Sequence, residues 1–349
     1  MKVMVAMSGG VDSSVAAALL AREGHDVVGV TMRLWGGESD TGCCSVSDVD
    51  DARRVAQQLG IDHLVFNFTA DFDRAVVDPY VRAHADGGTP NPCIECNRSV
   101  KFARLAERAE LLGFDAVATG HHARIGRREG VRTLERGADR AKDQSYVVHM
   151  LDQAALARTL FPVGIFPEKG QLRALAAQLG LRTAAKPDSQ DVCFITSTGG
   201  RDDFLRRRIP FHPAAVVDTA GARVGEVAAI ELITMGQRRG LGLPGGGPKR
   251  FVVDIDRAAA VVVVGDEADV LRPGLTIRDV SWVEREFAGA VLVQCSAHGT
   301  PQPATVEPDG DAVVVRWAAP QRRVAPGQSV VLYDPTDTFV LGGGIVSGA

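Results

Sequence analysis

The sequence lacks several features that would place it in a membrane, secreted or strongly nucleic-acid-binding class. No stretch of 18 consecutive apolar residues occurs, so we expect no membrane span. The N-terminus begins directly with an apolar strand pattern, so we expect no secretory signal peptide and a cytoplasmic location. Aromatic residues make up only 5%, and a formal net charge of −4 indicates no general attraction to nucleic acid, although a local basic patch stays open.

Cysteine is also scarce. Six cysteines in 349 residues are too few for a disulfide scaffold, and in a reducing cytosol they favour reactive or metal-binding roles. Hydrophobic residues at 45% and charged residues at 23% indicate a globular protein with a sizeable core. The length indicates two or three domains.

The first loop has no lysine after its glycines. An apolar strand pattern from Val3 to Met7 ends at Ser8, Gly9 and Gly10, and a helix pattern follows from Ser13. The glycines allow positive φ and close approach of a ligand. The helix N-terminus directs free N–H groups and a positive dipole end at the same point. This segment therefore predicts a phosphate site, but not a Walker A loop, which would contain a lysine.

Strand and helix patterns alternate over the first half of the chain. Strands are predicted at 26–31, 63–68 and 116–119, and helices at 48–59 and 100–112. This order predicts a doubly wound parallel sheet, in which ligands bind at the C-terminal ends of strands. Beyond residue 205, short Val- and Ile-rich runs broken by Gly, Pro and Asp predict β structure. We predict three domains, an α/β domain over 1–204, a small central β domain over 205–272 and a β-barrel over 273–349.

Two cysteine segments have the composition of a reactive site. Cys93 and Cys96 form a CxxC in an ordered loop before the 100–112 helix, and Arg98 and Lys101 beside Cys96 favour the thiolate. Cys193 follows a polar turn and begins an apolar stretch. The remaining cysteines are expected to be structural: Cys43, Cys44 and, in a barrel strand, Cys295.

These motifs, in this order, resemble the tRNA-specific 2-thiouridylases of the PP-loop ATP pyrophosphatase superfamily. They cover nearly the whole chain: S-G-G-V-D-S-S, P-N-P-C-I-E-C-N, T-G-H-H, K-D-Q-S-Y, S-Q-D-V-C-F, M-G-Q-R-R-G-L-G and L-G-G-G. The resemblance implies an adenine nucleotide α hydrolase-like fold. It also implies that ATP and Mg²⁺ activate the C2 oxygen of the wobble uridine of tRNA, with cleavage between the α- and β-phosphates, and that sulfur then replaces this oxygen.

The resemblance also implies roles for individual residues. Cys193 would receive a persulfide from a sulfur-carrier protein or cysteine desulfurase, and Cys96 would be the nucleophile that later forms a disulfide with it; both roles require accessible thiols. Asp12 would lie near Mg²⁺, and His121 and His122 beside the nucleotide. The implied ATP contacts are Ala6, Met7, Ser8, Gly9, Gly10, Val11, Asp12, Ser13, Met32 and Gly120. The implied tRNA contacts are Asn91, Pro92, Cys93, Lys142, Asp143 and Gln144.

Two departures from the family leave alternatives open. Many members have Asp at the position of Cys93, so Cys93, Cys96 and Cys193 as ligands of an iron–sulfur cluster are a second mechanism. A basic stretch in the barrel of other members is replaced here by Ser296, Ala297 and His298, so no tRNA contact is carried over to it. Apart from the cluster, no dedicated metal ligands are predicted.

Basic pairs and triplets supply candidate phosphate contacts, namely Arg206–Arg208, Arg238–Arg239 and Lys249–Arg250. Two other functions also remain open: a PP-loop synthetase that adds nitrogen to a small molecule, and an RNA-binding adaptor with a vestigial nucleotide site. The first would not need Cys96 and Cys193, and the intact Ser8, Asp12 and Ser13 disfavour the second.

Overall fold

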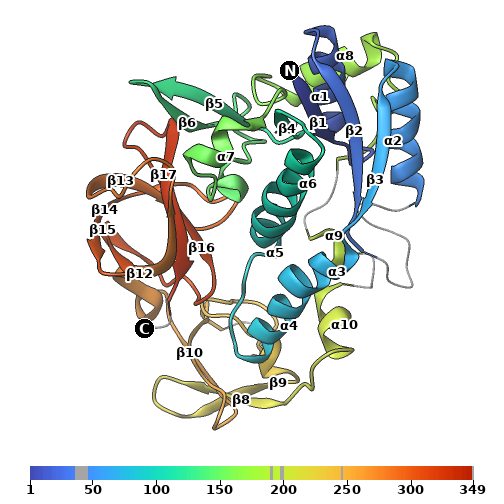
Figure 1. The fold of residues 1–349 in the computed structure, drawn as a ribbon. Helices are drawn as coiled ribbons and strands as arrows, with labels where there is room; N and C mark the ends of the chain where they lie inside the picture. The colour runs from blue at the N-terminus through green and yellow to red at the C-terminus, as the bar shows by residue number, and fades with distance from the viewer. Residues whose placement is uncertain (36–45, 189–191, 197–199, 245–246, 348–349) are drawn as a thin grey trace.

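The computed structural model describes residues 1–35, 46–188, 192–196, 200–244 and 247–347. Within these residues the strands form an N-terminal parallel sheet, a small central sheet and a C-terminal barrel (Figure 1). The predicted fold class is therefore confirmed. No helix in the described part of the chain is long and apolar enough to cross a membrane.

The N-terminal sheet is covered on both faces. Its strand order is β3-β2-β1-β4-β7, and all pairings are parallel. Val3 and Val5 of the central strand pack into one hydrophobic cluster, and Met4 and Ala6 pack into another, as the two-residue period of a strand requires. The strands are β1 (Lys2–Ala6), β2 (Asp26–Arg33), β3 (Asp62–Asn67), β4 (Ala116–Ala118) and β7 (Thr159–Leu160).

Helices form the layers on either side of this sheet. One face is covered by α1 (Val11–Arg22), α2 (Val46–Leu59) and α8 (Lys169–Gln178). The other face is covered by α3 (Thr69–Phe72), the π-helical η1 (Asp73–Val77) and the helical run that ends in α6 (Leu105–Leu111). The helix α4 (Asp78–Ala85) continues η1 away from the sheet (Figure 1).

The helical run that carries two of the cysteines begins earlier than predicted. Helix starts at α5 (Pro92–Glu95), continues as the π-helical η2 (Cys96–Arg104) and joins α6. The prediction of a loop around Cys93 and Cys96 is therefore wrong. Pro92 fits the first helical position because its fixed φ suits a helix and its missing N–H has no partner there. A π-helical stretch is rare and is often found at functional sites.

The second half of the chain is β-rich, as predicted. The central sheet has the order β10-β11-β8-β9, and pairing of β12 with β17 closes the C-terminal strands into a barrel. The central strands are β8 (Ala214–Asp218), β9 (Arg223–Val227), β10 (Phe251–Asp256) and β11 (Val261–Gly265). The barrel strands are β12 (Leu271–Trp282), β13 (Gly289–Gln294), β14 (Gln302–Asp309), β15 (Ala312–Arg322), β16 (Ser329–Tyr333) and β17 (Phe339–Val346).

Short helices join these parts. They are η3 (Ser145–Val148), α7 (Gln153–Ala157), α9 (Cys193–Thr196), α10 (Arg201–Arg206), η4 (Ile230–Leu232) and η5 (Ala268–Val270).

A hairpin from the N-terminal part of the chain extends the barrel sheet, which the sequence analysis did not predict. Strands β5 (Ala123–Arg128) and β6 (Val131–Arg136) pair with each other, and β6 pairs with β17 through Glu135 and Phe339. This pairing joins two segments that the sequence analysis assigns to different domains.

Three consecutive glycines in β17 allow the strand to pass between its neighbours. A Cβ on Gly342 would lie 2.6 Å from the Ser281 carbonyl oxygen, and one on Gly343 would lie 2.5 Å from the His149 ring. A Cβ on Gly344 would lie 2.7 Å from the Arg278 carbonyl oxygen. The L-G-G-G motif therefore has a packing role.

We expect Gly343→Ala to lower the free energy of unfolding by about 1–3 kcal/mol, because the added methyl group overpacks the site. Gly170→Ala in α8 is the control, since no atom lies within 4 Å of its Cβ position. This change is expected to be neutral or to stabilise by up to about 1 kcal/mol. Urea unfolding of both variants measures the difference, and equal stability of Gly343→Ala and wild type would contradict the packing described.

Candidate functional site

The glycine loop lies between β1 and α1, as predicted, and is held by short-range hydrogen bonds. Gly9 has a φ of +72°, and a Cβ there would lie 2.3 Å from the Asp48 carbonyl oxygen. The Ser8 N–H donates to Ser13 Oγ at 3.2 Å, and Ser14 Oγ donates to the Gly10 carbonyl oxygen at 2.8 Å. Ser14 is fully buried, so its role is to shape the loop. Only a residue without a side chain fits at Gly9.

The carboxylate of Asp12 is the centre of the site. Lys169 Nζ lies 2.5 and 2.6 Å from its two oxygens, and His122 Nε2 lies 2.9 Å from Oδ1. Burial acts to raise the pKa of Asp12, but hydrogen bonds from His122 and Lys169 outweigh it and hold the pKa below its usual value. Asp12 is therefore ionised at neutral pH.

Lys169 is a candidate functional residue that the sequence analysis missed. It lies 157 residues from Asp12 in the chain and begins α8. A cation is unfavourable at the positive end of a helix dipole unless an anion lies nearby. A lysine at the start of a helix was therefore the feature of the sequence that could have indicated a nearby anion. Lys169 supplies from another helix the positive charge that the loop itself lacks.

A second carboxylate, Asp188, connects this lysine to the predicted tRNA loop. Its oxygens lie 3.2 Å from Lys169, 2.9 Å from Lys142 and 2.6 Å from Arg173. Burial acts to raise the pKa of Asp188, but Lys142 and Lys169 outweigh it and hold the pKa well below its usual range. The cations therefore form one network with two carboxylates.

The predicted adenosine contacts come together at one edge of the sheet. Ser8, Met32 and Gly120 lie at the C-terminal ends of β1, β2 and β4, which are adjacent in the order β2-β1-β4. A Cβ on Gly120 would lie 2.7 Å from the Ser13 nitrogen, so β4 and α1 approach closely at this point. Ala6, Met7 and Val11 flank the loop and are buried. Contact of these residues with a nucleotide stays a prediction.

The loop that contains Lys142, Asp143 and Gln144 is tied to the Asp12 centre. Gln144 Oε1 accepts from the His122 N–H at 2.9 Å, and the Gln144 N–H donates to the His122 carbonyl oxygen at 2.8 Å. The Asp143 side chain is only 5% exposed and pairs with Arg136. It also accepts hydrogen bonds from Gly137 and Ser145. Asp143 thus shapes the loop, and its contact with tRNA stays a prediction.

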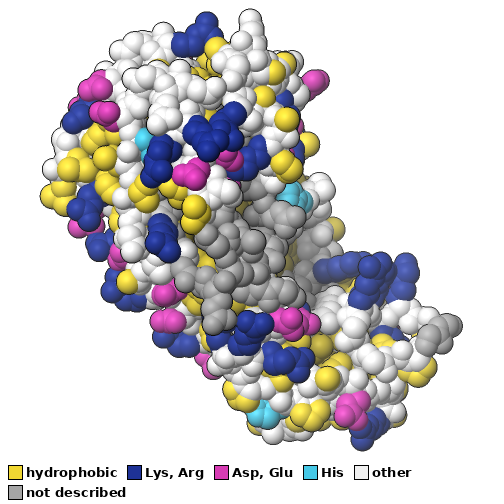
Figure 2. Space-filling model, turned by 90° about the vertical axis from the view of Figure 1, so that its right-hand side faces the viewer, with side chains coloured by type: hydrophobic (Ala, Val, Ile, Leu, Met, Phe, Trp, Pro, Cys, Tyr) yellow, Lys and Arg dark blue, Asp and Glu magenta, His cyan; other side chains and the backbone are white. Residues whose placement is uncertain are grey.

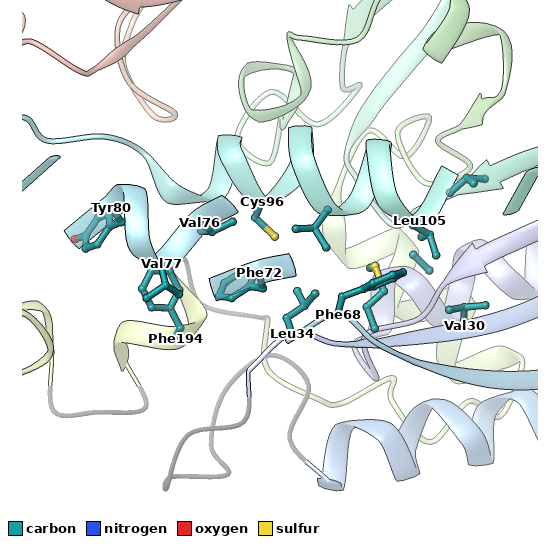
Figure 3. Close-up of a cluster of buried hydrophobic side chains, with 14 of the residues drawn as sticks. Val30, Leu34, Phe68, Phe72, Val76, Val77, Tyr80, Cys96, Leu105 and Phe194 are labelled. Carbon is teal, nitrogen blue, oxygen red and sulfur yellow. The ribbon is translucent and has the colours of Figure 1, made fainter. Parts of the chain in front are cut away.

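Cys96 and the Cys193 segment pack against one aromatic cluster. Cys96 is 8% exposed, and Figure 3 shows its sulfur pointing from the helix into the cluster that contains Phe72 and Phe194. The Phe194 ring lies 5.5 Å from Phe72 and 5.7 Å from Tyr80. The expectation of an accessible thiol therefore does not hold for Cys96 in this conformation, whereas Cys193 is half-buried.

The structure also places the other cysteine motifs. The Asn91 side chain caps α5 by accepting from the Cys93 N–H at 3.0 Å. Cys295 directly follows β13 and packs against the barrel core, and burial raises the pKa of its thiol to about 12. Cys43, Cys44 and the Ser189–Asp191 part of the S-Q-D-V-C-F motif lie outside the described residues.

The residues present fit Mg²⁺ better than an iron–sulfur cluster. Among the described residues, no three His, Cys, Asp or Glu side chains are close enough to hold a metal ion. Mg²⁺ commonly needs only one or two carboxylates together with substrate phosphates, and Asp12 beside the glycine loop meets that requirement. A cluster on Cys93, Cys96 and Cys193 would require these side chains to move together.

Basic side chains gather on one face of the molecule. Figure 2 shows a group of Lys and Arg side chains on the lower part of this face and others on the upper part. Among the predicted basic runs, the Arg208 guanidinium lies 3.9 Å from the Phe204 ring centroid, and that of Arg206 lies 4.9 Å from Phe211. Arg208 also donates a hydrogen bond to the Phe204 carbonyl oxygen at 3.0 Å, and its charge interacts with the carboxylate of Asp73.

Comparison with known proteins covers the whole length of the chain. Three family models match successive parts of the chain. They are the tRNA methyl transferase HUP domain over 1–197, the tRNA methyl transferase PRC-barrel domain over 202–266 and the aminomethyltransferase β-barrel domain over 272–346.

Full-length relatives are named for thiolation. The tRNA-specific 2-thiouridylase MnmA of Herpetosiphon aurantiacus is 46% identical, with 99% of this chain and 98% of the relative covered. The MnmA of Roseiflexus castenholzii is 44% identical, with 99% of this chain and 99% of the relative covered. The MnmA of Symbiobacterium thermophilum is also 44% identical, with 100% of this chain and 92% of the relative covered. The chain therefore belongs to the family of tRNA-specific 2-thiouridylases.

Proposed function

We propose that this protein uses ATP to replace the C2 oxygen of the wobble uridine of tRNA by sulfur. The observation that carries the proposal is the connection between two parts of the site. The loop of Lys142 to Gln144, predicted to contact tRNA, holds His122 against Asp12 beside the glycine loop. Such a connection suits an enzyme that cleaves ATP when RNA is bound, and it does not suit an adaptor with a vestigial site.

The first step is adenylation of the uridine. The C2 oxygen attacks the α-phosphorus of ATP, the bond to the bridging oxygen of the β-phosphate breaks, and pyrophosphate leaves. Backbone N–H groups at the start of α1 and the ammonium of Lys169 stabilise negative charge on the pyrophosphate. Asp12 orients Lys169 and His122. Asp12 together with the phosphates would hold Mg²⁺, which neutralises phosphate charge.

The second step transfers sulfur. Cys193 carries a persulfide received from a sulfur-carrier protein or cysteine desulfurase, and its terminal sulfur attacks C2 as AMP leaves with the electron pair of the C–O bond. The Cys96 thiolate then attacks the Cys193 sulfur, the persulfide S–S bond breaks, and the electron pair stays with the sulfur on the uridine. A Cys96–Cys193 disulfide remains, and a thiol reductant restores both thiols.

Nucleoside analysis of unmodified tRNA tests the proposal. The enzyme is incubated with ATP, Mg²⁺ and a persulfide donor, and 2-thiouridine is expected in tRNA but not in free uridine, because the loop base is read in an unstacked RNA context. A methylated uridine, or equal thiolation of the free nucleoside, would overturn the proposal. ATP-dependent amidation of a small molecule by a Cys96→Ser variant would instead support the synthetase.

Lys169→Met is expected to slow tRNA-dependent AMP formation by about 100-fold or more, the size typical for loss of one charge-stabilising donor. Its loss also raises the pKa of Asp12, because one of the two groups that lower it is gone. The acidic limb of the pH–rate profile should therefore move to higher pH. Arg182→Met, which removes an exposed ion pair with Asp51, is the control and should leave rate and profile unchanged. A wild-type profile in Lys169→Met would contradict the role given to Lys169.

Cys93→Ser separates the two sulfur mechanisms. A persulfide relay uses only Cys96 and Cys193, so the variant should keep substantial thiolation activity. A cluster with three cysteine ligands would lose one of them, and bound iron and activity would disappear together. Anaerobic purification of wild type and variant, with iron and sulfide analysis and a thiolation assay, measures both. We expect the relay, and iron-dependent wild type with an inactive Cys93→Ser variant would exclude it.

A further inference from the structure

A buried arginine joins the barrel to the predicted tRNA loop. The Arg136 side chain is 6% exposed and lies at the end of β6. One terminal nitrogen donates to Asp143 and to Gln294, each at 2.8 Å. Its Nε and other terminal nitrogen donate to Asp337 Oδ1 at 2.9 and 2.6 Å. The guanidinium carbon lies 3.5 Å from the ring centroid of Tyr333.

The partners of Arg136 come both from the barrel and from the Lys142–Gln144 loop. Gln294 ends β13, Tyr333 ends β16, and Asp337 lies in the turn between β16 and β17. Gln294 also donates to the Ser296 and Ala297 carbonyl oxygens at 2.8 and 3.1 Å. Arg136 therefore fixes three barrel positions relative to Asp143 of the loop.

The same loop continues to the nucleotide centre. Asp143 is followed directly by Gln144, which bonds the His122 backbone in both directions, and His122 bonds Asp12. We call the chain of contacts from the barrel through Arg136, Asp143 and His122 to Asp12 the route. The Arg136 and His122 side chains are 6% and 4% exposed, so solvent screens this part of the route little. A shift of the barrel residues that bond Arg136 would therefore change the position of His122 relative to Asp12.

We propose that Arg136 is a positioning residue that couples tRNA bound at the Lys142–Gln144 loop to ATP binding at Asp12. The inference rests on the proposed function, since tRNA is the ligand that acts on the loop. Bound tRNA fixes the loop, the loop fixes His122, and ATP then meets an aligned centre. Coupling between two such sites typically changes an affinity about 5–150-fold.

The test measures this coupling directly. The dissociation constant of a non-cleavable ATP analogue is determined with Mg²⁺, without tRNA and with saturating unmodified tRNA, and the ratio of the two is the coupling factor. In the wild type we expect tRNA to tighten analogue binding by about tenfold. In Arg136→Lys, which keeps the charge but loses the planar set of donors, the factor should fall toward one.

Two further variants keep the test decisive if Arg136→Lys does not fold. Asp337→Gly removes both acceptor oxygens on the barrel side, suits the φ of +57° at this position and leaves Arg136 paired with Asp143, and it should also lower the coupling factor. Arg223→Ala is the control, because exposed Arg223 pairs with Glu226 in the central sheet and contacts none of the residues that join Arg136 to Asp12. It should retain the wild-type factor.

Several outcomes would overturn the inference. A wild type that thiolates tRNA but shows a coupling factor of one would do so, and so would an unchanged factor in folded Asp337→Gly. Parallel losses of thermal stability, tRNA affinity and tRNA-free analogue affinity would show that Arg136 is only structural. A wild type without thiolation would contradict the proposed function instead, so the two failures are distinguishable.

Discussion

The structure depends on compensating one half-buried negative charge, the carboxylate of Asp12. A carboxylate at this depth is unfavourable unless it is paired and hydrogen-bonded. Lys169 and His122 meet that need from two other elements, and so the start of α8 and the loop after β4 are fixed against the glycine loop. The same pairing places a cation where a phosphate loop without lysine requires one. One pairing of charges therefore fixes both the packing of these elements and the geometry of the proposed nucleotide site.

The sequence predicts the features that depend on local patterns. The alternation of Val3 to Ala6, the glycine turn and the helix after it specify a buried strand and a phosphate loop, and the structure confirms their fold. Contacts between distant segments have no local pattern. Lys169 lies 157 residues from Asp12, and the β6–β17 pairing joins Glu135 to Phe339. The start of the helix at Pro92 was missed because two prolines and an Asn were interpreted as a loop.

The position of Cys96 constrains how sulfur reaches the substrate. Its thiol is packed with Phe72 and Phe194, and Phe194 directly follows Cys193 in α9 (Figure 3). If Cys96 attacks Cys193 during the reaction, this cluster has to open. Exposing one large apolar side chain costs about 1.5–3 kcal/mol. That free energy has to come from binding of tRNA or of the sulfur donor, which is consistent with a site that assembles only on the substrate complex.

In the proposed reaction, the Asp12–Lys169 centre holds the pyrophosphate part of ATP while the α-phosphorus reacts. The most direct measurement is the identity of the nucleotide products when ATP labelled at the α-phosphate is incubated with enzyme, Mg²⁺ and unmodified tRNA, with the sulfur donor present. We expect labelled AMP and unlabelled pyrophosphate, formed in amounts equal to the thiolated uridine. Labelled ADP with release of inorganic phosphate would contradict it.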